Sequence, residues 1–341
     1  MSIDDTSTLS SSNKPREQDH EHENALISNL VDRYKDKLTT FPIEKGCVFG
    51  SLYMYQGFWY LSQHKLSIET LFALHETFIA RPNDVYVATL PKSGTTWLKA
   101  IVFSTVNRSR YKYNCLATHP LRVSNPHKCC PFIETEFYES APTYNDTHSP
   151  RIFGTHTPYT SLPRSIIDSG CRIIYMCRNP KDVLVSLFHF SDKVREQSGD
   201  LMKINDAFEL FSKGVMPYGP YWDHVKEYNS ASLERPTKVL FLTYENMKKD
   251  TANGVKRIAE FLGYPFTDEE VDQGSIEEIV KLCSFESLKE VDQKGNYHGV
   301  PNGSYFREGK VGDWTNHLTN EMCMILDQIT KEKFNGLDIL C

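Results

Sequence analysis

No stretch of this 341-residue chain approaches the roughly eighteen consecutive apolar residues of a membrane-spanning helix. The opening residues, MSIDDTSTLSSSNKPREQDHEHEN, are polar and of mixed charge, so they lack the apolar segment of a secretory signal. Their acidic residues are also untypical of an organelle transit peptide. We therefore expect a cytoplasmic protein that has no membrane-bound segment.

Cysteine patterns that hold metals are missing as well. The nine cysteines lie at irregular spacings without a CxxC pair, which argues against a zinc ribbon and against a thioredoxin-type site. An odd number of cysteines without a secretory signal fits a reducing compartment. His20 and His22 lie in the polar tail, where solvated side chains are a better explanation than a metal site. We expect no bound metal.

An excess of positive charge is also lacking. The formal net charge is −6, which argues against a nucleic-acid partner but leaves room for a local basic pocket. Residues 1–25 carry little apolar surface to offset the entropy lost on ordering. Internal repeats and low-complexity linkers are absent. We therefore expect a disordered tail over residues 1–25 and one domain over residues 26–341.

The chain does contain alternating strand and helix patterns. Segments rich in β-forming residues predict strands at 84–90, 151–155, 172–177 and 238–244. Helices are predicted at 97–106, at 182–190, and where apolar residues recur at helical spacing: Val255, Ile258, Ala259 and Leu262. A polar helix is predicted over 26–38 and long loops over 117–150. This order predicts an α/β fold, a single domain with a central, mainly parallel β-sheet flanked by helices.

A polar turn joins the first predicted strand to its helix, with the sequence PKSGTTW at residues 91–97. Backbone amides converge at such a turn and favour an anion, and Gly94 allows close approach of a phosphate. An ordinary turn would need Gly94 and a cap, but not Lys92 together with two threonines. The turn is not a Walker A loop, because its lysine precedes its only glycine.

Four segments together resemble the cytosolic sulfotransferase family. They are PKSGTTW at 91–97, RNPKD at 178–182 followed by Ser186, YEN at 244–246, and YFREGKVGDW at 305–314. The last contains a specific RxGxxGDW pattern, and the resemblance extends from about Tyr53 to the C-terminus. The segments YQGFW, GPYWDH and KLCSFE look most like the plant branch. The fold implied has a P-loop-like phosphosulfate loop.

The resemblance implies a donor, 3′-phosphoadenosine 5′-phosphosulfate (PAPS), that leaves as 3′-phosphoadenosine 5′-phosphate (PAP). The 5′-phosphosulfate would be bound by Lys92, Ser93, Gly94, Thr95 and Thr96. The 3′-phosphate would be bound by Arg178, Ser186, Arg307 and Gly309, with Glu308 in the same loop. The adenine would lie among Trp97, Tyr244, Phe285 and Phe306. A planar guanidinium and hydroxyl donors suit a phosphate dianion.

The resemblance also implies the catalytic residues. His156 would accept the proton of an acceptor hydroxyl, which suits an imidazole whose ordinary pKa is about 6.5. Lys92 would stabilise negative charge on the departing bridging oxygen, an effect of about 2.7–4 kcal/mol per donor in other enzymes. Ser186 would restrain Lys92 until the acceptor binds. Transfer would be in line and loose, with positioning the main requirement and no metal required.

Three residues depart from patterns common in the family. Gly154 stands where animal members often have a lysine two residues before the histidine. Glu308 replaces a common lysine, which removes a cation near the 3′-phosphate and could weaken donor binding. Cys283 stands where many animal members have threonine. None of these changes removes one of the implied roles.

The acceptor is expected to be a small hydroxylated molecule, of the flavonoid, steroid, hydroxyjasmonate or desulfo-glucosinolate class. Its pocket would be largely apolar and would draw on Phe58 and Tyr60, on Pro126 and His127, and on His189 or Tyr218. The dimerisation motif KxxxTVxxxE of animal members is absent from residues 320–341. We therefore expect a monomer.

Three alternatives remain at this point. A P-loop kinase of small metabolites would need a Walker A loop and Mg²⁺ ligands. A binding protein without catalytic activity could keep the nucleotide site, although the presence of both Lys92 and His156 argues against it. A Golgi-type sulfotransferase would need a signal anchor.

Overall fold

The structure is a computed structural model and describes residues 33–34, 36–46, 50–62, 68–111, 119–134, 150–195, 201–291, 295–297, 299–337 and 339. The tail expected over residues 1–25 lies outside these residues. So does most of the helix expected over 26–38, of which residues 33–34 and 36–38 are described and are helical.

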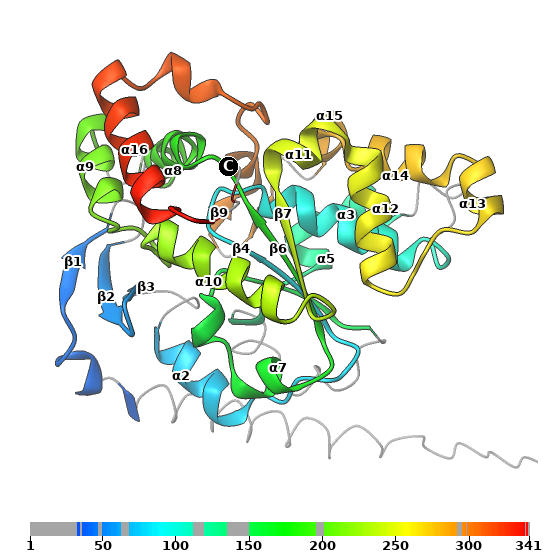
Figure 1. Cartoon of the computed structure of the whole chain (residues 1–341), viewed down its shortest axis with the longest axis horizontal. Coiled ribbons are helices and arrows are strands. Elements are labelled where there is room, and N and C mark those ends of the chain that lie inside the picture. The colour runs from blue at the N-terminus through cyan, green and yellow to red at the C-terminus, as the bar shows by residue number, and fades with distance from the viewer. Residues whose placement is uncertain are drawn as a thin grey trace, which may run out of the picture.

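A parallel sheet of four strands forms the centre of the described structure (Figure 1). Its order is β5-β4-β6-β7, and all neighbouring strands run parallel. The strands are β4 (Val85–Thr89), β5 (Ile152–Thr155), β6 (Arg172–Cys177) and β7 (Val239–Thr243). They coincide with the four strands predicted from the sequence. With helices on both faces, the predicted α/β fold class is confirmed.

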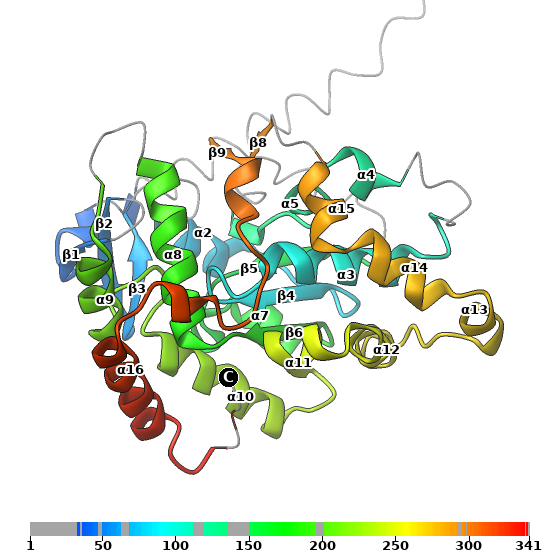
Figure 2. The ribbon, with the colours of Figure 1, turned by 90° about the horizontal axis from the view of Figure 1, so that it is seen from above.

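Helices cover both faces of this sheet because its strands are apolar on both sides. Along β4, Tyr86 and Ala88 join one buried cluster, whereas Val85 and Val87 join another. The first cluster includes helices α2 (Ile68–Thr77), α8 (Pro180–Arg195), α10 (Tyr221–Glu234) and α16 (Asn320–Lys333). The second includes α3 (Thr95–Asn107), α12 (Thr251–Phe261) and α14 (Ser275–Leu282). Figure 2 shows α3 and α10 on opposite sides of the sheet.

The three predicted helices are confirmed as α3, α8 and α12, each slightly longer than the sequence pattern indicated. None of the described helices is both long and apolar enough to span a bilayer. Several further helices are short: α7 (Arg164–Asp168), α9 (Ile204–Ser212), α11 (Tyr244–Lys249), α13 (Asp268–Asp272), α15 (Phe285–Glu290), and the 3₁₀ turns η3 (Tyr159–Ser161), η4 (Asn302–Tyr305) and η5 (Asp313–Asn316).

Two small antiparallel sheets complete the described structure. Strands β1 (Ile43–Lys45), β2 (Ser51–Tyr55) and β3 (Phe58–Leu61) form one of them. The turn between β2 and β3 uses Gln56 and Gly57, both with positive φ, as a tight two-residue hairpin turn requires. Strands β8 (Asn296–Tyr297) and β9 (Val300–Pro301) form the other.

The described part of the region expected to be loops, residues 119–134, contains two short helices. They are α4 (Pro120–Val123) and α5 (Pro126–Cys129). Each begins with a proline, and the side chains of His119 and Asn125 accept hydrogen bonds from the backbone two residues later. Proline at the first helical position and a side-chain cap before it both favour a helix start, so this part of the loop prediction was wrong.

A buried ion pair joins the starts of β4 and β5 at the amino-terminal edge of the sheet. Arg151 donates to Asp84 through Nε at 2.8 Å and through Nη2 at 2.5 Å. Both side chains are almost completely withdrawn from water. The Asp84 carboxylate also accepts hydrogen bonds from the Arg81 amide and the Tyr86 hydroxyl. The pair therefore helps to hold two strands of the central sheet at this edge.

Asp84→Ala should destabilise the protein by about 3–5 kcal/mol, because it leaves the Arg151 guanidinium buried without its counter-ion. Urea unfolding followed by circular dichroism measures this change. The matched control is Asp168→Ala, which removes the exposed pair with Arg164 and should change stability by about 0.5 kcal/mol or less. Equal, small effects of the two substitutions would contradict the structural role of Asp84.

Candidate active site

The carboxyl ends of the four parallel strands lie at one edge of the sheet, and the expected site residues follow them. His156 follows β5 directly, Arg178 follows β6, Tyr244 follows β7, and the turn with Lys92 follows β4. Ligands of open α/β sheets bind outside this edge. Parallel pairing thus brings together segments that are far apart in the sequence.

The turn after β4 is packed closely against its neighbours. Gly94 has φ +96°, and a Cβ there would lie 2.8 Å from both Met176 Cε and Tyr244 Cδ2. Lys92 also has a positive φ, of 68°, which is uncommon for a residue with a side chain. Glycine at 94 is therefore required by both the conformation and the space available, and helix α3 begins immediately after it.

The polar groups of this turn are arranged around the start of α3. The hydroxyls of Thr95 and Thr89 are 2.6 Å apart, and Thr96 Oγ1 lies 3.0 Å from His127 Nε2. Ser93 Oγ is buried and has no hydrogen-bond partner in the described part of the chain. The first turn of α3 contains no acidic residue. An anion could therefore be bound here by the Ser93 hydroxyl and by backbone amides.

Lys92 lies beside several other cations. Its Nζ is 4.0 Å from the centre of the Phe190 ring. Withdrawal from water, together with the positive charges of Arg178, Lys193 and Arg307, lowers the pKa of Lys92 to about 7. Among the described residues the Lys92 ammonium makes no hydrogen bond to the buried hydroxyl of Ser186. A bound polyanion would relieve the repulsion among these cations.

Arg178 and Asp182, at the start of α8, bind the loop formed by residues 307–314, which is called the C-terminal loop below. Arg178 Nη2 donates to the carbonyl of Lys310 at 2.8 Å. Asp182 accepts hydrogen bonds from the amides of Gly312, at 2.8 Å, and Trp314, at 3.1 Å. Arg178 Nε is buried without a partner in the described residues. Arg178 Nη1 also donates to the carbonyl of Lys92 at 3.4 Å, so these contacts link residues 307–314 to the turn after β4.

Four aromatic residues expected at the adenine lie in two contacting pairs. Trp97 and Tyr244 meet edge to face, with ring centres 5.4 Å apart, and Phe285 and Phe306 meet in the same way at 6.0 Å. Gly309 connects the two pairs. Its carbonyl accepts a hydrogen bond from the Tyr244 hydroxyl at 3.0 Å, and a Cβ on it would lie 2.6 Å from Phe285.

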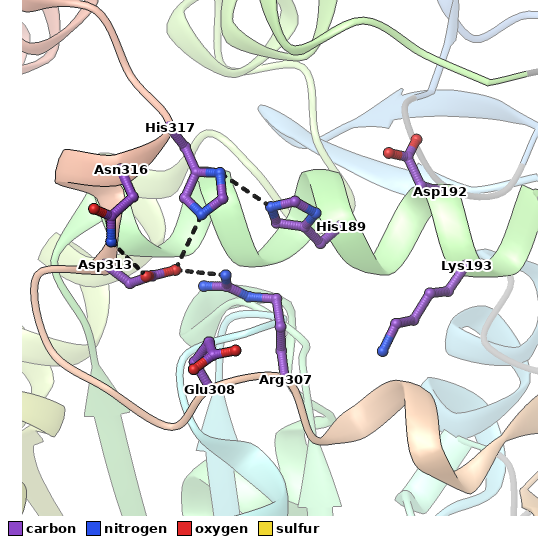
Figure 3. A pocket seen from close by; sticks show the side chains of 8 residues that line it. All are labelled: His189, Asp192, Lys193, Arg307, Glu308, Asp313, Asn316 and His317. Carbon is purple, nitrogen blue, oxygen red and sulfur yellow. Dashed lines mark hydrogen bonds and ion pairs between the residues drawn. The ribbon is translucent and has the colours of Figure 1, made fainter.

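A pocket of about 400 Å³ opens between α8 and the C-terminal loop (Figure 3). Arg307 is paired with Asp313 at 2.5 Å, and Asp313 lies 3.3 Å from His317 Nε2. His317 in turn is 3.4 Å from His189. The pocket therefore combines fixed positive charge with a histidine pair; its lining residues are His189, Asp192, Lys193, Arg307, Glu308, Asp313, Asn316 and His317.

His156 is fixed by the backbone of the neighbouring strand. Its Nδ1 lies 2.6 Å from the carbonyl oxygen of Thr89, so the ring carries its proton on Nδ1 and leaves a lone pair on Nε2. Burial lowers the pKa of His156 to about 3, which keeps the imidazole neutral. The ring packs against Phe132 at 4.7 Å and Tyr218 at 5.5 Å. It is thus arranged to accept a proton at Nε2.

A second histidine supports His156, and the sequence analysis did not single it out. His224 is fully buried on α10, with Nε2 3.0 Å from the carbonyl of His156 and Nδ1 2.9 Å from the Tyr175 hydroxyl. Burial lowers the pKa of His224 to about 4. It therefore donates from Nε2 to His156 and accepts from Tyr175. His224 ends the segment GPYWDH, which was noted only as typical of the plant branch and did not indicate this contact.

Several residues expected near the acceptor form an aromatic group around His156. Tyr218 contacts the His156 ring directly, and Tyr60 meets Tyr218 edge to face at 5.9 Å. Phe58 meets His224 at 6.3 Å. These side chains come from β3 and from the segment before α10, so the small antiparallel sheet contributes one wall of this group.

The two remaining histidines expected near the acceptor lie apart. His127, which follows Pro126 at the start of α5, stacks on Phe132 at 5.3 Å and so lies near His156. His189 instead lines the pocket that contains Arg307. Phe132, which contacts both His127 and His156, was missed by the sequence analysis because its region was expected to be irregular.

Two of the departures noted in the sequence have local explanations. Glu308 pairs with exposed Lys310 at 3.3 Å, so the negative charge of Glu308 is balanced by a neighbouring cation. Cys283 is fully buried, with Sγ 3.5 Å from the Ser104 hydroxyl on α3. It therefore packs against the helix that begins at the candidate site.

Comparisons with known proteins show the family of this chain. Residues 82–338 match the sulfotransferase domain family. A protein named cytosolic sulfotransferase 16 from Arabidopsis thaliana is 43% identical over 318 residues, which cover 90% of this chain and 92% of that protein. A flavonol 4′-sulfotransferase from Flaveria chlorifolia is 43% identical over 296 residues, which cover 85% of this chain and 90% of that protein.

Solved structures give the same result. An Arabidopsis thaliana sulphotransferase, provisionally assigned to steroids, superposes with a TM-score of 0.73 at 38% identity, covering 92% of this chain and 97% of that one. A mouse sulfotransferase complexed with PAP superposes with a TM-score of 0.65 at 29% identity, covering 84% of this chain and 95% of that one. The family resemblance stated from the sequence is confirmed.

Lys92→Met should stabilise the protein at pH 6 more than at pH 9. The folded-state pKa of Lys92, about 7, lies below its ordinary value of 10.5, so between these values the unfolded chain binds more protons and wild-type stability rises with pH. The increase in unfolding free energy that results from removing the Lys92 charge is therefore greatest below pH 7. Unfolding free energies of both proteins at the two pH values measure it, with exposed Lys213→Met as control. An increase in unfolding free energy that is larger at pH 9 than at pH 6 would contradict the lowered pKa of Lys92.

Proposed function

The chain belongs to the sulfotransferase family, and on this basis we propose that it transfers a sulfuryl group from PAPS to a hydroxyl of a small organic acceptor. The observation that carries the proposal is the hydrogen bond from His156 Nδ1 to the Thr89 carbonyl. It ties a neutral base to the strand that leads into the turn with Lys92, so that base and cation occupy the same edge of the sheet.

The donor suits groups that the described chain leaves without partners. Ser93 Oγ and the Nε atoms of Arg178 and Arg307 are buried without hydrogen bonds there. A Cβ at Gly94 or at Gly309 would overlap a neighbouring side chain, so both closely packed positions require glycine. We assign residues 92–96 to the 5′-phosphosulfate. We assign Arg178, Ser186, Arg307 and Gly309 to the 3′-phosphate, and Trp97, Tyr244, Phe285 and Phe306 to the adenine. Glu308 lies in the same loop but would contribute no positive charge.

In the proposed reaction, the acceptor oxygen attacks sulfur while its proton passes to Nε2 of His156. The bond between sulfur and the bridging oxygen breaks in line, and PAP leaves with the electron pair on its 5′-phosphate. Lys92, as the ammonium ion, would stabilise this charge. The polyanionic donor favours the charged form of Lys92, because opposite charges raise the pKa of an amine. Ser186 would contact Lys92 only after a change from the arrangement described, in which Lys92 lies over Phe190.

The acceptor is proposed to lie against the aromatic group that contains Phe132, Tyr218, Phe58 and Tyr60. Flat apolar side chains beside His156 favour a flavonoid or steroid over a strongly charged molecule, and one relative is named a flavonol 4′-sulfotransferase. Hydroxyjasmonates and desulfo-glucosinolates remain in the proposed range. We further propose that the protein acts as a monomer in the cytoplasm, where its named relatives are assigned.

Incubation with PAPS and a panel of flavonols, sterols, hydroxyjasmonates and desulfo-glucosinolates should give a product with one added sulfuryl group, detected by mass spectrometry. His156→Ala should lower turnover by about 10²–10⁴-fold, because the acceptor proton loses its base, while PAP binding is retained. Exposed His75, on α2, provides the control His75→Ala. Undiminished turnover in His156→Ala would reject His156 as the base, and failure of the wild type to bind PAP would reject the donor site.

PAP binding should take up protons at pH 8 and should weaken as the pH rises above about 7. In the free protein Lys92 is then largely neutral, and the bound phosphates favour its ammonium form. Calorimetry in two buffers with different ionisation enthalpies measures the uptake. Lys92→Met should abolish it and Lys213→Met should not. Equal uptake in wild type and Lys92→Met would show that another group is responsible.

A further inference from the structure

Lys99, on α3, is the most deeply buried cation near the candidate site. It is 0% exposed, and lysine is rarely so buried without compensating interactions. Its Nζ lies 3.3 Å from the centre of the Phe132 ring, whose face stabilises a cation. It also lies 3.1 Å from Nδ1 of His127. Neither residue was assigned a part in donor binding above.

The chemistry of these groups determines which atom donates and which accepts in each hydrogen bond. An ammonium group can only donate hydrogen bonds, so Nδ1 of His127 accepts. A neutral imidazole then carries its hydrogen on Nε2, which lies 3.0 Å from Oγ1 of Thr96. Thr96 therefore accepts from His127, and its own hydroxyl hydrogen can be donated to another group. Chains of hydrogen bonds with one direction strengthen each other in a buried setting.

We propose that Lys99 and His127 are positioning residues, which set the Thr96 hydroxyl as a hydrogen-bond donor to the 5′-phosphosulfate end of the donor. The inference rests on the proposed function, because it takes residues 92–96 as the binding turn for that group. Thr96 lies in the first turn of α3, next to Thr95. Hydrogen bonds to an anion are stronger than those between neutral groups, so a hydroxyl directed in advance gains affinity.

Gly154 leaves the room that Lys99 needs. A Cβ at residue 154 would overlap Cε and Nζ of Lys99. Gly154 lies on β5, two residues before His156, and the strand packs next to α3. The glycine noted in the sequence as a departure therefore has a structural reason in this chain, since a side chain at this position would displace the Lys99 ammonium.

The tautomer of His127 is the first test. In protein labelled with ¹⁵N-histidine, two-bond correlations should show His127 neutral, with its hydrogen on Nε2. The variant His127→Gln removes this signal and so assigns it among the twelve histidines. A hydrogen on Nδ1 of wild-type His127 would overturn the proposal, because Lys99 could not then donate to that atom.

The second test is a double-mutant cycle on PAP affinity. Lys99→Met should weaken PAP binding by about ten- to a hundredfold, the typical effect of one hydrogen bond to a charged group. In a Thr96→Val background, Lys99→Met should cause no further loss, since the hydroxyl it directs is gone. In a Thr96→Ser background, which keeps the hydroxyl, the loss should return. Losses that multiply independently in Thr96→Val would overturn the proposal.

Gly154→Ala provides a variant that keeps the charge of Lys99. The atoms nearest its methyl group are the end of the flexible Lys99 side chain and, at 3.3 Å, Cδ1 of Phe132, so the protein should fold while the ammonium is displaced from His127. It should weaken PAP binding as Lys99→Met does and allow the hydrogen of His127 to move to Nδ1, even if Lys99→Met fails to fold. Wild-type affinity and tautomer in Gly154→Ala would overturn the proposal. Absence of PAP binding in the wild type would instead reject the proposed function, and the tautomer would still report on the Lys99 contact.

Discussion

Parallel pairing of β4 with β5 and β6 is the constraint on which the rest of the site depends. Because these strands run in the same direction, the turn with Lys92, the ring of His156 and the guanidinium of Arg178 all emerge at one edge. The hydrogen bond from His156 to Thr89 crosses from β5 to β4. A shift of register between these two strands would therefore move the proposed base relative to the phosphate-binding turn, even though every side chain remained present.

The same edge gathers positive charge without enough negative charge to balance it. Asp182 and Asp313 engage the C-terminal loop and Arg307, but the nearby cations still depress the pKa of Lys92. Such repulsion destabilises the free protein and is relieved by a polyanion. Stability is therefore lowered where a highly charged donor would bind. At the opposite edge of the sheet, by contrast, the buried charge of Arg151 is balanced by that of Asp84.

The sequence predicted the central fold well, because apolar β-forming segments at 84–90, 151–155, 172–177 and 238–244 are bounded by polar turns. It could not predict the contacts that depend on three-dimensional packing. The sequence around His224, Phe132 and Lys99 does not indicate their contacts, since each contact is made with a segment distant in the sequence. The starts of α4 and α5 were different: proline after a capping residue was visible in the sequence and was overlooked. The roles given to the site residues remain predictions.

Two histidines in this region are held in opposite tautomers by the chemistry of their partners. The Thr89 carbonyl can only accept, so it places the hydrogen of His156 on Nδ1 and leaves Nε2 to receive a proton. The Lys99 ammonium can only donate, so it places the hydrogen of His127 on Nε2, facing Thr96. Exchanging the two partners would leave both rings in place but reverse what each can do. The partner of the second ring nitrogen, more than the presence of histidine, therefore determines which ring could act as a base and which could direct a hydroxyl toward an anion.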